Sequence, residues 1–93
     1  MFVGVLQVDF VIRGSHSLKD RRRIVRSIKD RAGHRFNISI AEVGDVELWQ
    51  RASLGVALVG RERHFVETSL DEVLRFFRGA PDAELTNHQI DIL

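Results

Sequence analysis

The chain has 93 residues, 44% of them hydrophobic, and a formal net charge of +1. This length is enough for one domain with a core of its own, so we expect a single domain over residues 1–93. Because the sequence contains no cysteine, it excludes disulfides, thiolate metal sites and cysteine nucleophiles.

The N-terminus predicts a strand and not a targeting segment. It is apolar, but it carries Gln7 and Asp9 and lacks the basic leading region of a signal peptide. The longest uncharged apolar run, residues 54–60, is too short to cross a bilayer. We therefore expect a soluble, intracellular protein without a membrane partner.

Charge is unevenly distributed along the chain. Residues 19–31 hold seven basic and two acidic side chains, a balance of +5, whereas residues 62–93 hold seven acidic side chains against three arginines, a balance of −4. Such asymmetry indicates either an anionic partner or head-to-tail self-association.

The first half of the chain predicts a strand, a helix and a second strand. Residues 2–12 alternate between apolar and mixed positions, as in a half-buried strand. A break over residues 13–16 leads to a helix over residues 17–33, with Ser17 as N-cap, Asp20 in a variant of the capping box and Gly33 as a left-handed C-cap. Residues 35–43 alternate again.

The predicted helix over residues 17–33 has two different sides, roughly 135° apart around its axis. One side is apolar and consists of Leu18, Ile24, Val25, Ile28 and Ala32. The other, which we call the basic stripe, consists of Lys19, Arg22, Arg23, Arg26 and Lys29. Arg21 projects into the apolar side, where its guanidinium must either reach past the sheet edge or pair with a carboxylate, with Asp9 and Glu42 as candidates. We expect a structural ion pair in preference to a ligand contact.

The second half repeats the alternation of strand and helix. Residues 44–51 form a longer connection, with a helical turn capped by Asp45, and residues 53–60 form a nearly continuous apolar strand. Residues 62–78 return to helical periodicity with a wide apolar face, ended by Gly79 and Pro81, and residues 85–92 form a last strand. All six phenylalanines are assigned to the core.

The predicted order is βαββαβ, which specifies an α+β, ferredoxin-like, split βαβ sandwich. We expect a four-stranded antiparallel sheet in the order 4-1-3-2, with both helices on one face. The open face would carry no aromatic side chains, which argues against base stacking on the sheet. A small, partly apolar face instead favours sheet packing in a homodimer, and an unpaired strand edge offers a second route to oligomers.

Five segments of the chain also resemble a known family: VGVLQVDF, SHSLKDRRRIVRSIKDR, RFNISIAEVG, LWQRASLGVALVG and IDIL. In this order they are similar to the YlxP-like family of small bacterial proteins. The matching positions are Ser17, Leu18, Lys19, Arg21, Arg22, Phe36, Asn37, Glu42, Gly44, Leu48, Trp49, Gln50, Arg51 and Gly55. The resemblance implies a ferredoxin-like fold and a cytoplasmic bacterial protein. Genes of the family tend to lie near those of translation-initiation and ribosome-maturation factors, which implies work on RNA or the ribosome, and the family brings no catalytic residues.

Three groups of residues are candidates for function. The basic stripe fits phosphate binding, and the alternative is a solvated helix face with Asp30 as an internal ion-pair partner. The loop before the helix offers an anion site made of Arg13, Gly14, Ser15, His16 and Ser17. Acylphosphatases share this fold and bind an anion at this place, but residues 13–17 lack their glycine-rich pattern. Trp49 and Arg51 are either a partner anchor or a cap on the core.

The remaining motifs predict no cofactor and no metal, because the four histidines are scattered and lack zinc-ligand spacing. We expect a non-enzymatic module that associates with RNA or the ribosome through the basic stripe. A self-associating structural or regulatory domain is the first alternative, and a small-anion enzyme of the acylphosphatase type is the second.

Overall fold

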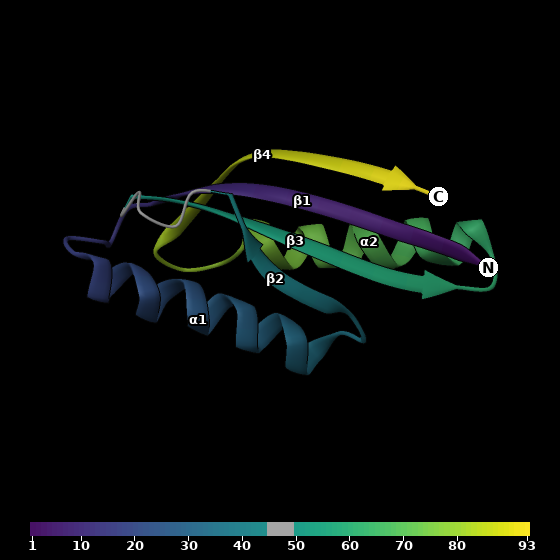
Figure 1. The fold of residues 1–93 in the computed structure, drawn as a ribbon, viewed down its shortest axis with the longest axis horizontal. Helices are drawn as coiled ribbons and strands as arrows, with labels where there is room; N and C mark the ends of the chain where they lie inside the picture. Colours follow the sequence, from purple (N-terminus) through teal and green to yellow (C-terminus); the bar gives the residue numbers. More distant parts are fainter. Residues whose placement is uncertain (45–49) are drawn as a thin grey trace.

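The computed structural model describes residues 1–44 and 50–93. Its elements are β1 (Phe2–Ile12), α1 (Leu18–Arg35), β2 (Ser39–Val43), β3 (Arg51–Gly60), α2 (Arg63–Arg78) and β4 (Ala83–Ile92). The strands form one antiparallel sheet in the order β2-β3-β1-β4 (Figure 1). The predicted ferredoxin-like topology is therefore confirmed.

The two long central strands, β1 and β3, carry the core. They pair from Phe2 opposite Gly60 to Val11 opposite Arg51. Their alternation puts one set of side chains under the helices, and these are buried: Leu6, Val8, Phe10, Ile12, Ala52, Leu54, Val56 and Leu58. The opposite side of the sheet stays uncovered in the described part of the chain, so all helix packing is on one face, as predicted.

Helix α1 begins as expected but ends later. Ser17 is the N-cap, and its hydroxyl accepts a hydrogen bond from the Asp20 amide at 3.1 Å. Gly33 lies inside the helix, whose last residue is Arg35 and whose C-cap is Phe36. The prediction of a left-handed cap at Gly33 was wrong, because the helix must run on to bring Phe36 and Ile38 against the core.

Other expected boundaries shift by a few residues. Strand β2 is shorter than the predicted 35–43, β3 starts two residues earlier at Arg51, and β4 starts at Ala83. The predicted helical turn at Asp45 lies outside the described residues. Gly79 is the C-cap of α2, as expected.

One predicted core phenylalanine is on the surface. Phe65 is 59% exposed. It lies in the first turn of α2, where the helix passes the end of β3, and its ring lies against the backbone of Gly60. Leu18, placed on the apolar side of α1, is also exposed.

The two helices are offset along the sheet. The molecule measures 43 × 22 × 18 Å, and α1 and α2 lie towards opposite ends of its long axis (Figure 1). Only their C-terminal portions come alongside each other, where Arg31 of α1 meets Phe76 of α2. This offset leaves most of α1 accessible to a partner.

Candidate nucleic-acid interface

Helix α1 is fixed in rotation by its buried side, and this decides where the basic stripe points. Ile24, Val25, Ile28 and Ala32 are buried against the core. Since the stripe lies roughly 135° away around the axis, it must face outward. Four of its five members, Lys19, Arg22, Arg23 and Arg26, are exposed, and Lys29 is partly buried.

No carboxylate of the described residues forms an ion pair with a stripe side chain. Within the described residues the ion pairs are Arg13–Glu84, Arg21–Glu42 and Arg63–Glu67, and none involves the stripe. Asp20 and Asp30 line the same shallow hollow of about 450 Å³ as Lys19, Arg22, Arg23, Arg26 and Ser27, but they form no ion pair with them. The ion pair expected of Asp30 is therefore not formed, and a solvated helix face stays the alternative to phosphate binding.

Arg21 anchors α1 to β2 from the opposite side. Its side chain is 6% exposed and forms an ion pair with Glu42, which is 22% exposed. Its Nε also donates to the carbonyl oxygen of Arg51, at 3.0 Å. The predicted ion pair is confirmed with Glu42, whereas Asp9 lies on the open face and accepts from Ser53 Oγ at 2.6 Å. This contact ties the first turns of α1 to β2 and β3, and so holds the stripe outward.

Several polar groups of the loop at residues 13–17 bond to other groups of the protein. Arg13 is turned towards β4, where its Nε donates to Glu84 at 2.8 Å. The His16 amide donates to the Asp20 carboxylate at 3.3 Å, and Ser15, which is buried, donates to the Ser17 carbonyl at 3.0 Å. The structure therefore places Arg13 away from the helix N-terminus, and the Asp20 carboxylate already occupies part of the predicted anion position.

The two proposed anchor residues are only partly described. Trp49 lies outside the described residues. Arg51 is the first residue of β3. Its side chain is exposed, and its backbone carbonyl oxygen accepts a hydrogen bond from Arg21 Nε. For Arg51 the structure thus shows a backbone role in holding α1.

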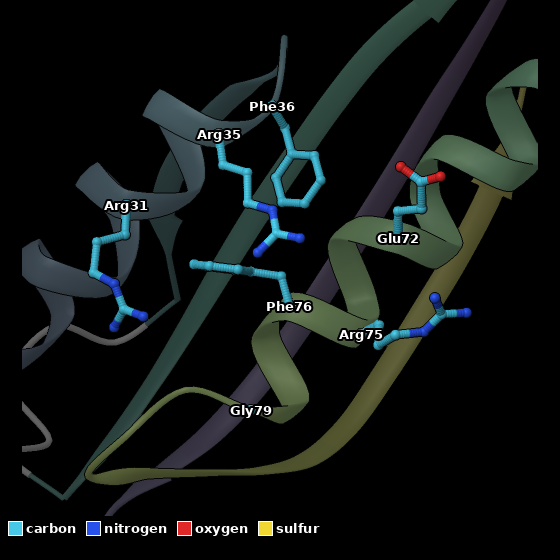
Figure 2. A pocket seen from close by; sticks show the side chains of 7 residues that line it. All are labelled: Arg31, Arg35, Phe36, Glu72, Arg75, Phe76 and Gly79. Carbon is cyan, nitrogen blue, oxygen red and sulfur yellow. The ribbon is translucent and has the colours of Figure 1, made fainter.

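Sequence reasoning did not identify a second basic site, which the structure shows between the two helices. The C-terminal halves of α1 and α2 border an open hollow of about 780 Å³. It is lined by Arg31, Arg35, Phe36, Glu72, Arg75, Phe76 and Gly79 (Figure 2). The i, i+4 spacing of Arg31 and Arg35 was a usable signal that both lie on one side of α1, but the assignment of Phe36 and Phe76 to the core hid the site.

The described residues hold no group of three or more histidine, aspartate and glutamate side chains that would suit a metal ion. Within the same residues, no helix is both long and apolar enough to span a membrane.

The topology and the outward basic helix define a ferredoxin-like α+β protein with a cationic surface. Residues 3–90 match the family model described as "Protein of unknown function (DUF503)". The chain is also 36% identical over 84 residues to "Uncharacterized protein YlxP" of Bacillus subtilis (strain 168), a match that covers 90% of this chain and 91% of that protein. The chain therefore belongs to the DUF503, or YlxP-like, family, as its motifs indicated.

Two solved structures of designed proteins are similar to the chain at low identity. "De novo designed protein Ferredog-Diesel" is 12% identical with a TM-score of 0.48, over 96% of this chain and 83% of its own. "De novo designed protein Foldit4" is 13% identical with a TM-score of 0.49, over 100% and 94%.

Proposed function

We propose that the chain is a non-enzymatic, cytoplasmic module that binds RNA, alone or within the ribosome, through the basic stripe of α1. The observation that carries this proposal is the stripe itself, a row of outward cations that form no ion pair with a carboxylate of the described residues, on a helix whose rotation is fixed by its buried side. Such a row supplies the charge-assisted N–H donors that phosphate oxygens accept.

The contacts would be made mainly to the phosphate backbone. Arginine binds phosphate through two parallel N–H groups, and three of the five stripe residues are arginines. Phosphate contacts position a protein on a nucleic acid but carry no sequence information of their own. We therefore expect binding by the stripe to depend strongly on salt and weakly on RNA sequence.

The open sheet face fits RNA less well. The described residues of β1 and β3 that point to this side include no aromatic ring, so bases have nothing to stack on. A carboxylate also stands at the middle of the face, because Asp9 is held there by Ser53. This leaves α1 as the better surface for a polyanion.

Charge reversal tests the proposal. The double variant Arg22→Glu/Arg26→Glu should abolish retention of single-stranded RNA in a filter-binding assay and co-migration with ribosomal particles on a sucrose gradient. The matched control is Arg61→Glu/Arg78→Glu, which changes the net charge equally at two other exposed arginines. Circular dichroism should show both variants folded. Equal loss in both variants, or in neither, would dismiss the stripe as the binding surface.

Self-association is the second candidate, and β4 is the observation that favours it. Among the described strands, β4 pairs with β1 alone, so no described strand pairs with the outer edge of Ala83–Ile92. A second route to self-association is contact between the acidic second half of one chain and the basic stripe of another.

A further inference from the structure

Two arginines of the hollow between α1 and α2 lie against aromatic rings. The guanidinium carbon of Arg31 lies 5.5 Å from the ring centroid of Phe76. Arg35 lies between two rings, 5.4 Å from Phe36 and 5.6 Å from Phe76 (Figure 2). The rings themselves meet edge to face, with centroids 5.7 Å apart. Both exposed guanidinium groups therefore lie against aromatic rings.

This arrangement leaves the hydrogen-bonding groups of the two arginines available. A guanidinium on a ring uses its flat face, whereas its N–H donors lie in its plane and point past the ring. In the described part of the chain neither Arg31 nor Arg35 forms an ion pair, in contrast to Arg13, Arg21 and Arg63, whose donors are taken by glutamates. Ordered donors without an acceptor are what an anion site requires.

The rest of the hollow adds charge and flat surface. Glu72 is its single carboxylate, and the cations on its α1 side are the guanidinium groups of Arg31 and Arg35. Glu72 and Arg75 point away from α1 (Figure 2), so the carboxylate does not face the Arg31–Arg35 pair. Phe36 and Phe76 are only half-buried, which leaves apolar surface next to the cations.

From this geometry we infer that the hollow binds a nucleotide, with its phosphate on Arg31 and Arg35 and its base against the stack formed by these arginines and Phe36 and Phe76. Arginine planes and aromatic rings are the side chains on which unpaired bases stack. The volume of about 780 Å³ suits a ligand of this size. The nucleotide is either free or the unpaired end of an RNA chain.

This site is separate from the basic stripe. Arg31 and Arg35 lie on the side of α1 that faces α2, roughly 160° around the helix axis from the centre of the stripe. The inference therefore goes beyond the proposed function and does not depend on it.

Calorimetry with four probes tests the inference: adenosine monophosphate, adenosine, inorganic phosphate, and a short single-stranded RNA with a 5′-phosphate. We expect the monophosphate to bind at least about tenfold more tightly than adenosine or inorganic phosphate. Adenosine lacks the phosphate contacts, and inorganic phosphate lacks the stacking of the base. The phosphorylated RNA should compete with the monophosphate if the source is an RNA end, and should not compete if the source is a free nucleotide. In NMR spectra, the Nε–Hε resonances of Arg31 and Arg35 should shift when the monophosphate is added.

Paired variants separate this site from the stripe. Arg31→Gln/Arg35→Gln should weaken monophosphate binding by more than about tenfold, whereas the matched control Arg22→Gln/Arg26→Gln should leave it unchanged. Phe76→Leu keeps the site apolar without the ring and should reduce the preference for monophosphate over phosphate. The inference is overturned if the monophosphate does not bind to the wild type, if inorganic phosphate binds equally well, or if the Arg31→Gln/Arg35→Gln protein, shown folded by circular dichroism, binds normally.

Discussion

At the scale of single residues, Arg21 shows what sequence periodicity can and cannot predict. Its place on the apolar side of the helix follows from a period of 3.6 and nothing else, so a buried ion pair was predictable. The choice of Glu42 over Asp9 depends on which face of the sheet each carboxylate occupies, and the alternation of residues 2–12 already places Asp9 away from the helices. Glu42 lies opposite Leu54, under α1, whereas Asp9 lies opposite Ser53 on the open side.

Removal of Arg21 should destabilise the protein. Arg21→Met would leave the partly buried Glu42 carboxylate and the Arg51 carbonyl without this donor, and we expect a loss of roughly 2–4 kcal/mol in the free energy of unfolding measured with urea. Arg22→Met, one position along and exposed, should change it by less than about 0.5 kcal/mol.

The double variant Arg21→Met/Glu42→Gln tests the coupling. It should recover part of the loss, because the amide no longer leaves an uncompensated charge. A double variant no more stable than Arg21→Met alone would show that the ion pair does not hold α1 in place.

At the scale of elements, Gly33 and Gly4 are two positions whose surroundings in the structure differ from what the sequence indicated. Gly33 had the sequence signal of a helix end, but α1 continues to Arg35, and the nearest neighbour of a Cβ at Gly33 would be Ile40 Cγ2 at 4.0 Å. In the sequence, Gly4 only interrupts an apolar strand, and nothing there indicates that a helix packs closely on it. A Cβ there would lie 2.5 Å from Val66 Cγ1 and 2.8 Å from Leu70 Cδ1, since α2 lies directly on β1.

The two positions should respond to alanine with opposite signs. Gly33→Ala adds a better helix former in open space and should raise the free energy of unfolding by about 0.5–1 kcal/mol. Gly4→Ala forces α2 away from the sheet and should lower it by about 1–3 kcal/mol. Urea denaturation of both variants measures the difference. A destabilised Gly33→Ala protein would contradict the observed end of α1.

At the scale of the whole molecule, the offset of the two helices separates what could be predicted about function from what could not. The basic stripe depends on one helix and its rotation, so local periodicity was enough to find it. The hollow depends on which turns of α1 and α2 lie alongside each other, and no local pattern in the sequence carries that information. Phe36 and Phe76 looked like core residues because their exposure is decided by this offset.

The oligomeric state belongs to this scale as well. We expect light scattering to give a monomer of 10.6 kDa at both about 50 mM and about 500 mM salt. The β4 edge carries Glu84 and Asp91, its pairing with β1 shifts register next to Asp9, and charges and bulges of this kind oppose edge-to-edge pairing. A dimer at low salt that dissociates at high salt would instead support the second candidate function.

The salt dependence of RNA binding tests the central claim most directly. If all five stripe side chains meet phosphates of a single strand, log K should fall with log salt with a slope of about −3.5, and Arg22→Gln/Arg26→Gln should reduce that slope by about 1.4. Arg61→Gln/Arg78→Gln should leave it unchanged. A wild-type slope near zero, or the same slope in the Arg22→Gln/Arg26→Gln protein, would contradict the account.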